Sequence, residues 1–502
     1  MTRPTPPIEF GRDFSEVTGR LARGIDMPDT WIKTMKDVCD DVSVTDEDLA
    51  ESSRDWWPLA LHWSLEGQVP VRASVVVRPK STQEVAAILK ACNENRIPVT
   101  PMAGRSGVCG SSVPLFGGVA LDMCSMAGVI DVDENSLIAT VLPGTFGPDL
   151  ELALRNKGCT LGHWPQSVAI STVGGWLACR GAGQYSTRYG KIEDMVLGLE
   201  VVLADGTVIR TDGTAPRSAT GPGLTGLFVG SEGILGVITE ASFKLHPTPE
   251  VERRVAFGFP SFADGLETCR RILRRGSTPA VLRLYDEVET KRNFNLEGQN
   301  LLIVLDEGDA ICTDAAMSVV EQECSGAEVL DISYVDKWLS HRNDTGALQD
   351  LTRLGIVVDT IEIAASWTAL DQLSQDAIAC MKAIPGNLNA SVHQSHAYTS
   401  GACLYFTFAG NAPEGTQDPK AWAADFYKDS WQAVMDATIA NGGAISHHHG
   451  IGINRARFMQ PSLGIGTMAL LSALKNALDP NGILNPGKLG LGTSLGELPW
   501  PE

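Results

Sequence analysis

The pattern of hydrophobic and polar positions becomes regular near residue 71. The run "ASVVVRP" (73–79) is apolar and β-branched, as in a buried strand. Ser81 and Glu84 then have the spacing of a helix-capping box. Apolar residues follow at helical period: Val85, Ile88, Leu89 and Cys92. Residues 97–100 read as the next strand, so the pattern predicts a β-α-β unit.

Strand patterns continue to about residue 245. The stretch "MVLGLEVVLADGTVIR" (195–210) predicts a hairpin that turns at Asp205-Gly206. The stretch "GSEGILGVITEASFKL" (230–245) returns to strand. The first 70 residues are polar, and we expect a helical N-terminal extension there; it contains Trp31, Trp56, Trp57 and Trp63.

Beyond residue 250, helical and strand patterns alternate. Helices are predicted over 262–276, 314–324 and 429–443, and strands over 279–286, 300–306 and 401–410. A further helix is expected before Pro480. This pattern is typical of an α+β unit with an antiparallel sheet and flanking helices. The expected domains are therefore 1–70, 71–248, 249–445 and a C-terminal segment over 446–502.

Three glycine-rich loops interrupt the strand-dense domain. The first, "PMAGRSGVCGSS" (101–112), is followed by another extended segment rather than by a helix, which argues against a Rossmann dinucleotide fold. Clustered backbone N–H groups can still hold a phosphate, although a plain glycine turn is the simpler alternative. The second loop covers 159–183 and the third begins at 230. Three such loops favour a long, phosphate-containing ligand held along its length.

The composition and charge of the chain limit the classes of binding partner that we expect. The chain has 502 residues, a formal net charge of −20 and ordinary hydrophobic and charged fractions of 43% and 20%. Such a chain repels nucleic-acid phosphates, so we expect no nucleic-acid partner. We expect no membrane span, because no apolar run is long enough, and a cytoplasmic location, because the eleven cysteines form no CxxC pair and no signal peptide is apparent.

Three consecutive histidines stand out in a chain that has nine. They lie in "NGGAISHHHGIGINRARFM" (441–459). The run is internal and only three residues long, which argues against a tag. Metal ligands, acid–base groups and ordinary polar loop residues remain as interpretations. In an extended chain only His447 and His449 would share a face, because side chains alternate.

Several longer motifs carry a family resemblance. They are "STVGGW" (171–176), "IEDMV" (192–196), "SEGILGVITEA" (231–241), "GACLYF" (401–406) and "NGGAISHHHGIG" (441–452). On these motifs the chain resembles the vanillyl-alcohol oxidase type (PCMH) flavoproteins over residues 55 to 490, and within them the alkyldihydroxyacetonephosphate synthases of ether-lipid synthesis. The resemblance implies a two-part FAD-binding domain of the PCMH type plus an antiparallel-sheet cap domain.

The resemblance assigns the glycine-rich loops to FAD. The first loop would wrap the pyrophosphate, the second would line the flavin, and the third would hold the adenine and ribose side. The implied cofactor-binding residues are Pro101, Met102, Ala103, Gly104, Arg105, Ser106, Gly107, Gln166, Ser167, Thr172, Cys179, Arg180, Gly181, Ala182, Glu232, Gly233, Gly236, Val237 and Ile238. Arg105 stands where relatives usually have glycine, and it either pairs a phosphate or points to solvent. The first loop has no histidine, so we expect noncovalent FAD.

The resemblance also assigns catalytic residues. They are His163, Arg283, Tyr405, His447, His448 and His449. In the synthases flavin N5 attacks the substrate carbon and displaces a fatty acid, and a fatty alcohol then replaces the flavin. Histidine suits the proton transfers this needs, tyrosine can relay or orient, and arginine can hold an anion. Each also has a structural alternative: His163 and Tyr405 as core residues, and Arg283 in an ion pair with Asp286.

We expect no metal site. Related D-2-hydroxy-acid dehydrogenases have an acidic residue where this chain has His448, and a second histidine motif on an earlier strand. That strand here reads "CLYFTFAGN" (403–411), without histidine. A lone histidine cluster does not easily complete a mixed coordination shell.

One departure bears on the substrate. Gln349, in "GALQDLTRLG" (346–355), stands where the synthases have an arginine, and Arg353 lies one helical turn further on. If Arg353 does not replace that arginine, phosphate recognition is lost, because glutamine is neutral. Two activities remain: synthase-like acyl/alkyl exchange on a substrate with a long apolar chain, or hydride transfer to flavin from an alcohol or hydroxy acid. By the resemblance, we expect a homodimer in either case.

Overall fold

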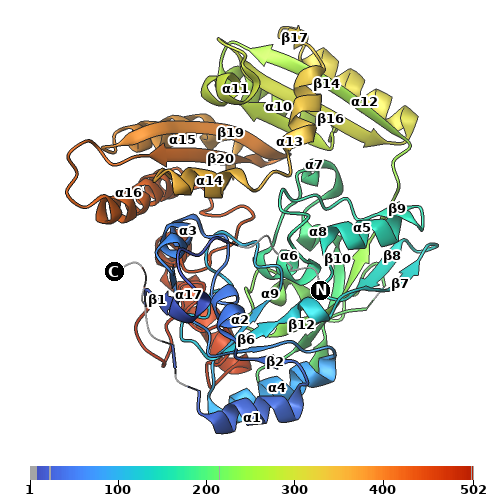
Figure 1. Cartoon of the computed structure of the whole chain (residues 1–502). Helices are drawn as coiled ribbons and strands as arrows, with labels where there is room; N and C mark the ends of the chain where they lie inside the picture. Colours follow the sequence, from blue (N-terminus) through green and yellow to red (C-terminus); the bar gives the residue numbers. More distant parts are fainter. Residues whose placement is uncertain (1–7, 22–23, 26, 214, 499, 501–502) are drawn as a thin grey trace.

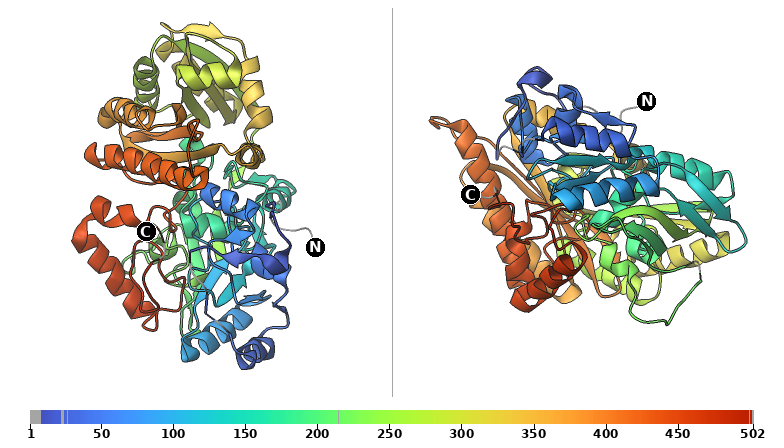
Figure 2. Two further views of the ribbon diagram at one scale, coloured as in Figure 1. Left: turned by 60° about the vertical axis from the view of Figure 1, so that its left-hand side comes forward. Right: turned by 90° about the horizontal axis from the view of Figure 1, so that it is seen from below.

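The computed structural model describes residues 8–21, 24–25, 27–213, 215–498 and 500. The first seven residues of the predicted N-terminal extension lie outside this description. Figure 1 shows two bodies, with the blue-to-green part of the chain below and the yellow-to-orange part above. The red C-terminal part of the chain returns to the lower body (Figure 2). Helices and strands thus mix in the way the predicted α+β class requires.

The lower body begins with short elements and the predicted β-α-β unit. The N-terminal elements are η1 (Phe14–Glu16), β1 (Thr18–Gly19), α1 (Asp29–Val38), β2 (Val42–Ser43), α2 (Asp46–Glu51), α3 (Pro58–Leu65) and β3 (Gln68–Val69). The unit itself is β4 (Val75–Val77), α4 (Thr82–Asn95) and β5 (Val99–Met102), followed by β6 (Val119–Asp122). The Ser81 hydroxyl accepts a hydrogen bond from the Glu84 backbone N–H, which confirms the predicted cap. The strands form a sheet in the order β2-β4-β6-β5, with the last three parallel.

A second sheet of the lower body is antiparallel, in the order β11-β10-β12-β8-β7. Its strands are β7 (Val129–Asp133), β8 (Ile138–Val141), β10 (Val196–Val202), β11 (Val208–Arg210) and β12 (Val237–Lys244). Val202 pairs with Val208 across the predicted Asp205-Gly206 turn. The remaining elements are η2 (Met123–Ser125), α5 (Gly147–Arg155), β9 (Cys159–Thr160), α6 (Val173–Cys179), α7 (Ser186–Tyr189), α8 (Ile192–Met195), α9 (Thr225–Phe228) and β13 (His246–Pro247).

The prediction that residues 159–183 form a loop is wrong over 173–179, because these residues form helix α6. The Thr172 hydroxyl caps this helix by accepting the Gly175 N–H. Two glycines and two small residues weaken the helical pattern in the sequence, although Val173, Trp176 and Leu177 form a buried apolar face. Thr172, Gly174 and Gly175, at the N-terminal end of this helix, line the cavity between the two bodies.

The upper body is built on a seven-stranded antiparallel sheet, in the order β17-β14-β16-β15-β19-β20-β18. The strands are β14 (Val251–Phe259), β15 (Val281–Tyr285), β16 (Asn300–Gly308), β17 (Glu328–Leu330), β18 (Val357–Ser366), β19 (Asn387–Tyr398) and β20 (Gly401–Gly410). The helices are α10 (Phe262–Arg274), α11 (Glu287–Phe294), α12 (Ala310–Glu323), α13 (Ser333–His341), α14 (Ala347–Arg353), α15 (Trp367–Lys382) and α16 (Pro419–Ala440). The helices α10, α12, α15 and α16 pack on this sheet, which is the antiparallel-sheet architecture expected for the cap.

The C-terminal segment ties the two bodies together. It leaves α16, runs through the histidines and continues into η3 (Ala456–Phe458) and α17 (Met459–Leu478). Ala444 bridges to Ala364 of β18 in the upper sheet, and Leu484 bridges in parallel to Val99 of β5 in the lower sheet. The histidine-containing loop therefore lies where the bodies meet. No helix among the described residues combines the length and apolarity needed to cross a membrane.

Candidate active site

A cavity of about 850 Å³ lies between the two bodies. The first glycine-rich loop lines it from 101 to 107, together with residues of the second and third loops. The other predicted cofactor-binding residues that line it are Gln166, Ser167, Thr172, Cys179, Gly181, Ala182, Glu232, Gly233, Gly236, Val237 and Ile238. Of the predicted catalytic residues, His163, Arg283, Tyr405, His448 and His449 line it as well. The structure thus gathers residues from four distant parts of the sequence at one hollow.

Arg180 is the exception among the predicted cofactor-binding residues. It ends α6 in the left-handed conformation, with φ +59°. Its side chain is largely exposed and forms an ion pair with Glu193 at 3.1 Å. Arg180 does not line the cavity, because the left-handed turn directs its side chain outward.

The first loop has the features of an anion cradle. Within the described part of the chain, the backbone N–H groups of Arg105, Ser106 and Gly107 have no hydrogen-bond partner. Arg105 has φ +53°, which explains why glycine is common at this position. Its side chain is buried rather than directed to solvent, hydrogen-bonds Ser52 at 3.3 Å and leaves Nε unpartnered. A buried guanidinium beside free N–H groups fits the pyrophosphate of a dinucleotide.

The third loop is fixed by the C-terminal segment. The buried Glu232 carboxylate accepts the backbone N–H groups of Ile451 at 2.6 Å and Gly452 at 3.0 Å. Gly233 has φ +76°, and a Cβ there would lie 2.4 Å from the Pro101 ring. The first and third loops therefore lie in close contact, and Gly233 leaves no room for a side chain there. These residues fit FAD.

The histidine loop curves around a single buried carboxylate. Glu362 of β18 accepts the backbone N–H groups of His447, His448 and His449 at 3.2, 3.0 and 2.7 Å. Its other oxygen forms a buried ion pair with Arg455. Burial alone would raise the pKa of Glu362, but Arg455, His449 and the N–H donors hold it well below its ordinary range.

This curvature corrects the expectation that only His447 and His449 would share a face. Three consecutive N–H groups converge on one oxygen, so the segment is not extended. As a result the imidazole Nδ1 atoms of His447 and His448 lie 2.9 Å apart. His449 instead faces Glu362, with Nδ1 at 3.5 Å from the carboxylate. Neighbouring rather than alternate histidines therefore interact.

A hydrogen-bonded chain runs from the protein interior to the cavity. The Ser186 hydroxyl lies 3.1 Å from the Tyr398 hydroxyl, which lies 2.9 Å from His447 Nε2. The shared Nδ1 contact continues to His448, which lines the cavity. The chain is satisfied when His448 donates through Nδ1 to His447, His447 donates through Nε2 to Tyr398, and Tyr398 donates to Ser186. This arrangement leaves His448 Nε2 unprotonated, as an acceptor toward a cavity ligand. We call these four residues the proton relay.

A second group surrounds Tyr405 on the cavity wall. The buried His393 bonds Glu289 through Nδ1 at 2.8 Å and Arg283 through Nε2 at 2.5 Å. Tyr405 stacks on His393, with ring centroids 4.9 Å apart, and its hydroxyl accepts from Thr360 at 3.0 Å. Arg283 therefore does not pair with Asp286, whose carboxylate caps α11 and accepts the Val392 N–H. Tyr405 and Arg283 are held in fixed orientations at the cavity.

Burial keeps the site imidazoles neutral. It lowers the pKa of His163 to about 3, and His163 packs on Trp176 with neither ring nitrogen bonded within the described residues. Burial also lowers the pKa of His447 to about 4 and that of His448 well below its ordinary value. Neutral imidazoles can both donate and accept protons near neutral pH.

The structure shows whether Arg353 can replace the arginine that the synthases have at the position of Gln349. Gln349 and Arg353 lie on α14 and do not line the cavity. Arg353 instead forms ion pairs with Glu9 at 2.6 Å and Asp350 at 2.5 Å. The cations that do line the cavity from the cap are Arg283, Arg292, Lys337 and Arg342. Arg353 therefore does not replace the arginine of the synthases.

Sequence reasoning missed several residues of the site. Glu362, Tyr398 and Cys403 carry no local motif. His393 and His396 have a visible signal in "SVHQSHAY" (391–398), on β19, the strand before β20. In the sheet His393 pairs with Tyr405 and His396 pairs with Cys403, so the histidine loop does not stand alone. The absence of histidine in "CLYFTFAGN" therefore does not settle the metal question.

Comparison with known proteins agrees with this geometry. Residues 73–212 match the family model described as an FAD binding domain, and residues 248–489 match the C-terminal domain of FAD linked oxidases. An uncharacterized FAD-linked oxidoreductase of Escherichia coli strain K12, YgcU, is 32% identical over 437 residues, 84% of this chain and 89% of its own. A solved alkyldihydroxyacetonephosphate synthase is 26% identical, with TM-score 0.78 over 96% of this chain and 90% of that one.

A solved p-cresol methylhydroxylase with substrate bound has TM-score 0.73 over 92% of this chain and 97% of that one. At 20% identity this likeness concerns the fold alone. Together the matches confirm the predicted two-part FAD-binding fold of the vanillyl-alcohol oxidase type and FAD as the cofactor.

Proposed function

The chain belongs to the family of FAD-linked oxidases, and on that premise we propose that it oxidises the hydroxyl-bearing carbon of a small anionic substrate. Arg105 and the N–H groups of residues 105–107 would hold the pyrophosphate of a noncovalently bound FAD. The glycines of the second and third loops would let the ring system approach the backbone closely. When bound, FAD supplies an N5 atom that accepts a hydride.

The residues of this chain handle the proton. When the carbon that bears the hydroxyl loses a hydride, the hydroxyl must also release its proton. A base within hydrogen-bond reach lowers the barrier. The proton relay offers such a base at His448, because His447 and Tyr398 can pass the charge away from the cavity. Tyr405, held by Thr360 and stacked on His393, is placed to orient the substrate oxygen. Both side chains line the same cavity.

The positively charged residues that line the cavity support the proposal of an anionic substrate. The whole chain has a net charge of −20, but the cavity is lined by five arginines and lysines and by three carboxylates. Arg283, Lys337 and Arg342 form no ion pair with a carboxylate within the described residues. Arg342 is instead held over the rings of Tyr185 and Trp338. Cations without a carboxylate partner, at the cavity of an acidic protein, favour a carboxylate or phosphate ligand.

A second candidate is the non-redox exchange of an acyl for an alkyl group. It is supported by the similarity to the solved alkyldihydroxyacetonephosphate synthase and by the same histidines and tyrosine. Its substrate would carry a long apolar chain. The position of Gln349 and Arg353 outside the cavity weighs against it, because the expected phosphate-binding arginine is missing there.

An acceptor-coupled assay tests the proposal. The holoenzyme is given an artificial electron acceptor and pairs of hydroxyl compounds that differ only in charge, such as a 2-hydroxy acid and its amide. We expect acceptor reduction with the acid, and a large rise in KM for Arg283→Met. Release of fatty acid from acyl-dihydroxyacetone phosphate, without acceptor reduction by any hydroxyl compound, would overturn it.

The homodimer and the cytoplasmic location stay predictions.

A further inference from the structure

A buried carboxylate and a buried imidazole lie behind Arg283 on the cap side of the cavity. Glu289, in the first turn of α11, is 1% exposed, and its Oε2 lies 2.8 Å from Nδ1 of His393 on β19. Nε2 of the same imidazole lies 2.5 Å from the Arg283 guanidinium. All three residues line the cavity. We call Glu289 and His393 the Glu/His dyad.

The arginine fixes the direction of both hydrogen bonds. A guanidinium can only donate, so Nε2 of His393 accepts from Arg283, and Nδ1 of the neutral ring donates to Glu289. Burial and the charge of Arg283 lower the pKa of His393 to about 4, which keeps the ring neutral. Burial alone would raise the pKa of Glu289, but His393 and the nearby arginines lower it to about 2. The dyad therefore has a single protonation state near neutral pH.

His393 separates the arginine from the carboxylate. Glu289 also accepts the hydroxyls of Ser391 and Thr407, at 3.1 Å each. Arg283 forms no ion pair with a carboxylate in the part of the chain that the structure describes, and its Nε is buried without a partner. A direct pair with Glu289 would neutralise the guanidinium, whereas the interposed imidazole is neutral. The arrangement thus leaves the positive charge of Arg283 for a ligand in the cavity.

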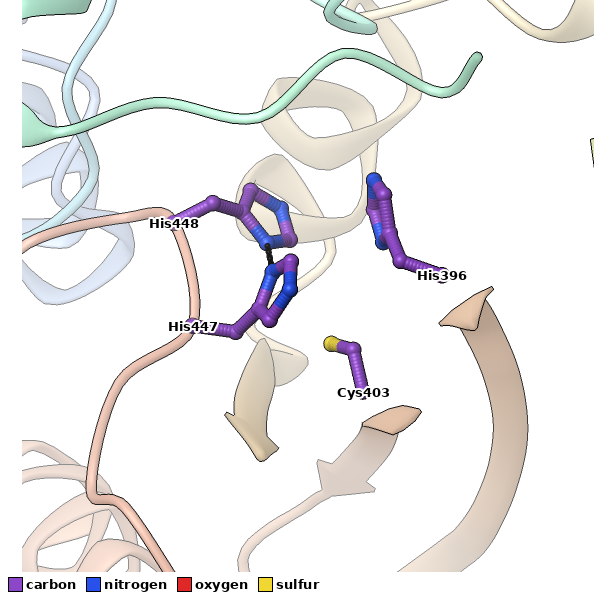
Figure 3. A group of neighbouring side chains, drawn as sticks. All are labelled: His396, Cys403, His447 and His448. Atoms are coloured by element: carbon purple, nitrogen blue, oxygen red, sulfur yellow. Dashed lines mark hydrogen bonds between the residues drawn. The ribbon is translucent and has the colours of Figure 1, made fainter. Parts of the chain in front are cut away.

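His393 and His396 of β19 contact different parts of the site. His396 lies beside the histidine loop, with its ring centroid 4.8 Å from that of His447 (Figure 3). His393 lies instead against Tyr405, with ring centroids 4.9 Å apart, and bonds Arg283. The Glu/His dyad is therefore bonded to the group that would hold the substrate anion, and not to the proton relay.

We propose that the Glu/His dyad is the positioning device that makes Arg283 the anion-binding group of the substrate site. Bonded to His393, the guanidinium keeps a fixed orientation at the cavity. Without the imidazole it would turn to the Glu289 carboxylate and be withdrawn from the substrate. Glu289 and His393 are thus positioning residues, which act through Arg283 and not on the reacting carbon. This role rests on the proposed function, because the anion that Arg283 meets is that of the substrate.

The relative activity with an acid and with its neutral amide tests this role. In the acceptor-coupled assay, we expect His393→Phe, which keeps the stacked ring but loses both nitrogens, to raise KM for a 2-hydroxy acid at least about tenfold. We expect no change with the amide. Arg283→Met/His393→Phe should lose no more than Arg283→Met alone, because both changes act on one guanidinium. His246→Leu, at a ring that packs on Tyr189 and does not line the cavity, is the matched control.

A conservative variant separates positioning from packing. In His393→Gln the side-chain amide can still donate to Glu289 and accept from Arg283, so we expect it to recover most of the loss with the acid. If His393→Phe does not fold, His393→Leu replaces it. Equal losses with the acid and the amide, or no recovery in His393→Gln, would overturn the positioning role.

Binding of propanoate to the holoenzyme separates the dyad from the proposed function. Propanoate has the carboxylate but no hydroxyl to oxidise, and its binding is followed by the change in the visible flavin spectrum. We expect at least about tenfold weaker binding in His393→Phe than in the wild type. Unchanged propanoate binding in that variant, with acceptor reduction by the acid intact, overturns the role and leaves the proposed function standing. Weakened propanoate binding in a protein that reduces no acceptor with any hydroxyl compound refutes the proposed function and leaves the dyad's role in anion binding standing.

Discussion

Glu362 is the point at which stability and site geometry can be tested together. Its carboxylate is fully buried, accepts three loop N–H groups and the Ser446 hydroxyl, and pairs with the fully buried Arg455. In Glu362→Gln the amide oxygen can keep the loop N–H groups. The amide N–H₂ then faces the Arg455 guanidinium, so two donors meet and a buried cation loses its counter-charge.

The expected cost follows from the burial of that cation. Removing one partner of a buried ion pair costs about 3–5 kcal/mol, because the remaining charge is uncompensated. The double variant Glu362→Gln/Arg455→Met removes the stranded cation and keeps the oxygen for the loop. We expect it to recover at least about half of the loss. Glu134→Gln is the control, because its pair with Lys157 is half exposed and contributes little to stability.

Urea unfolding followed by tryptophan fluorescence measures these differences at pH 7. Because the folded-state pKa of Glu362 is lowered, its contribution is present above the ordinary glutamate value of 4.5 and is lost as pH falls below it. The stability gap between wild type and Glu362→Gln therefore narrows in acid. A loss below about 1 kcal/mol for Glu362→Gln, or no recovery in the double variant, would refute the reasoning.

Four further predictions concern the site and its surroundings. His448→Ala keeps FAD bound, by its visible absorbance, but lowers kcat at least about 100-fold because the base is lost; full activity would refute the assignment. Arg105→Met weakens FAD binding, measured by flavin release on dilution, because the buried guanidinium no longer meets the pyrophosphate; unchanged retention would contradict this. Arg353→Ala leaves KM unchanged, since its partners are Glu9 and Asp350 outside the cavity; a raised KM would place it at the substrate. Burial raises the pKa of Asp359 to about 7, so its folded state is penalised as pH rises from 4 to 7, and Asp359→Asn flattens the pH dependence of urea stability by up to about 4 kcal/mol; an unchanged slope would contradict it.

Local patterns predicted much of the fold. The Ser81 cap, the Asp205-Gly206 hairpin and the helix before Pro480 depend on neighbouring residues only, and the structure has all three. Helix α6 was missed because its glycines give a weak local signal and its stability comes from packing of Trp176 and Leu177. The number and order of strands in the upper sheet could not be predicted from local sequence patterns, because contacts across the whole domain determine which strands pair.

The site was predictable only where a motif was local. The glycine loops and the histidine run were visible, but the curvature of the loop depends on Glu362, eighty-odd residues earlier on β18. The meeting of His396 with Cys403 depends on the register of β19 and β20. The prediction that side chains alternate along the histidine run was wrong at His447 and His448. The buried Glu362 carboxylate bonds three consecutive N–H groups there, so the segment is not extended.

Anaerobic titration of the flavin tests the central claim most directly. The yellow holoenzyme is mixed without oxygen with anionic hydroxyl compounds, and separately with acyl-dihydroxyacetone phosphate, while the visible flavin band is recorded. We expect bleaching by an anionic hydroxyl compound in the wild type and none in His448→Ala. A spectral change with acyl-dihydroxyacetone phosphate alone, with fatty acid released and no acceptor consumed, would contradict it and identify an ether-forming transferase.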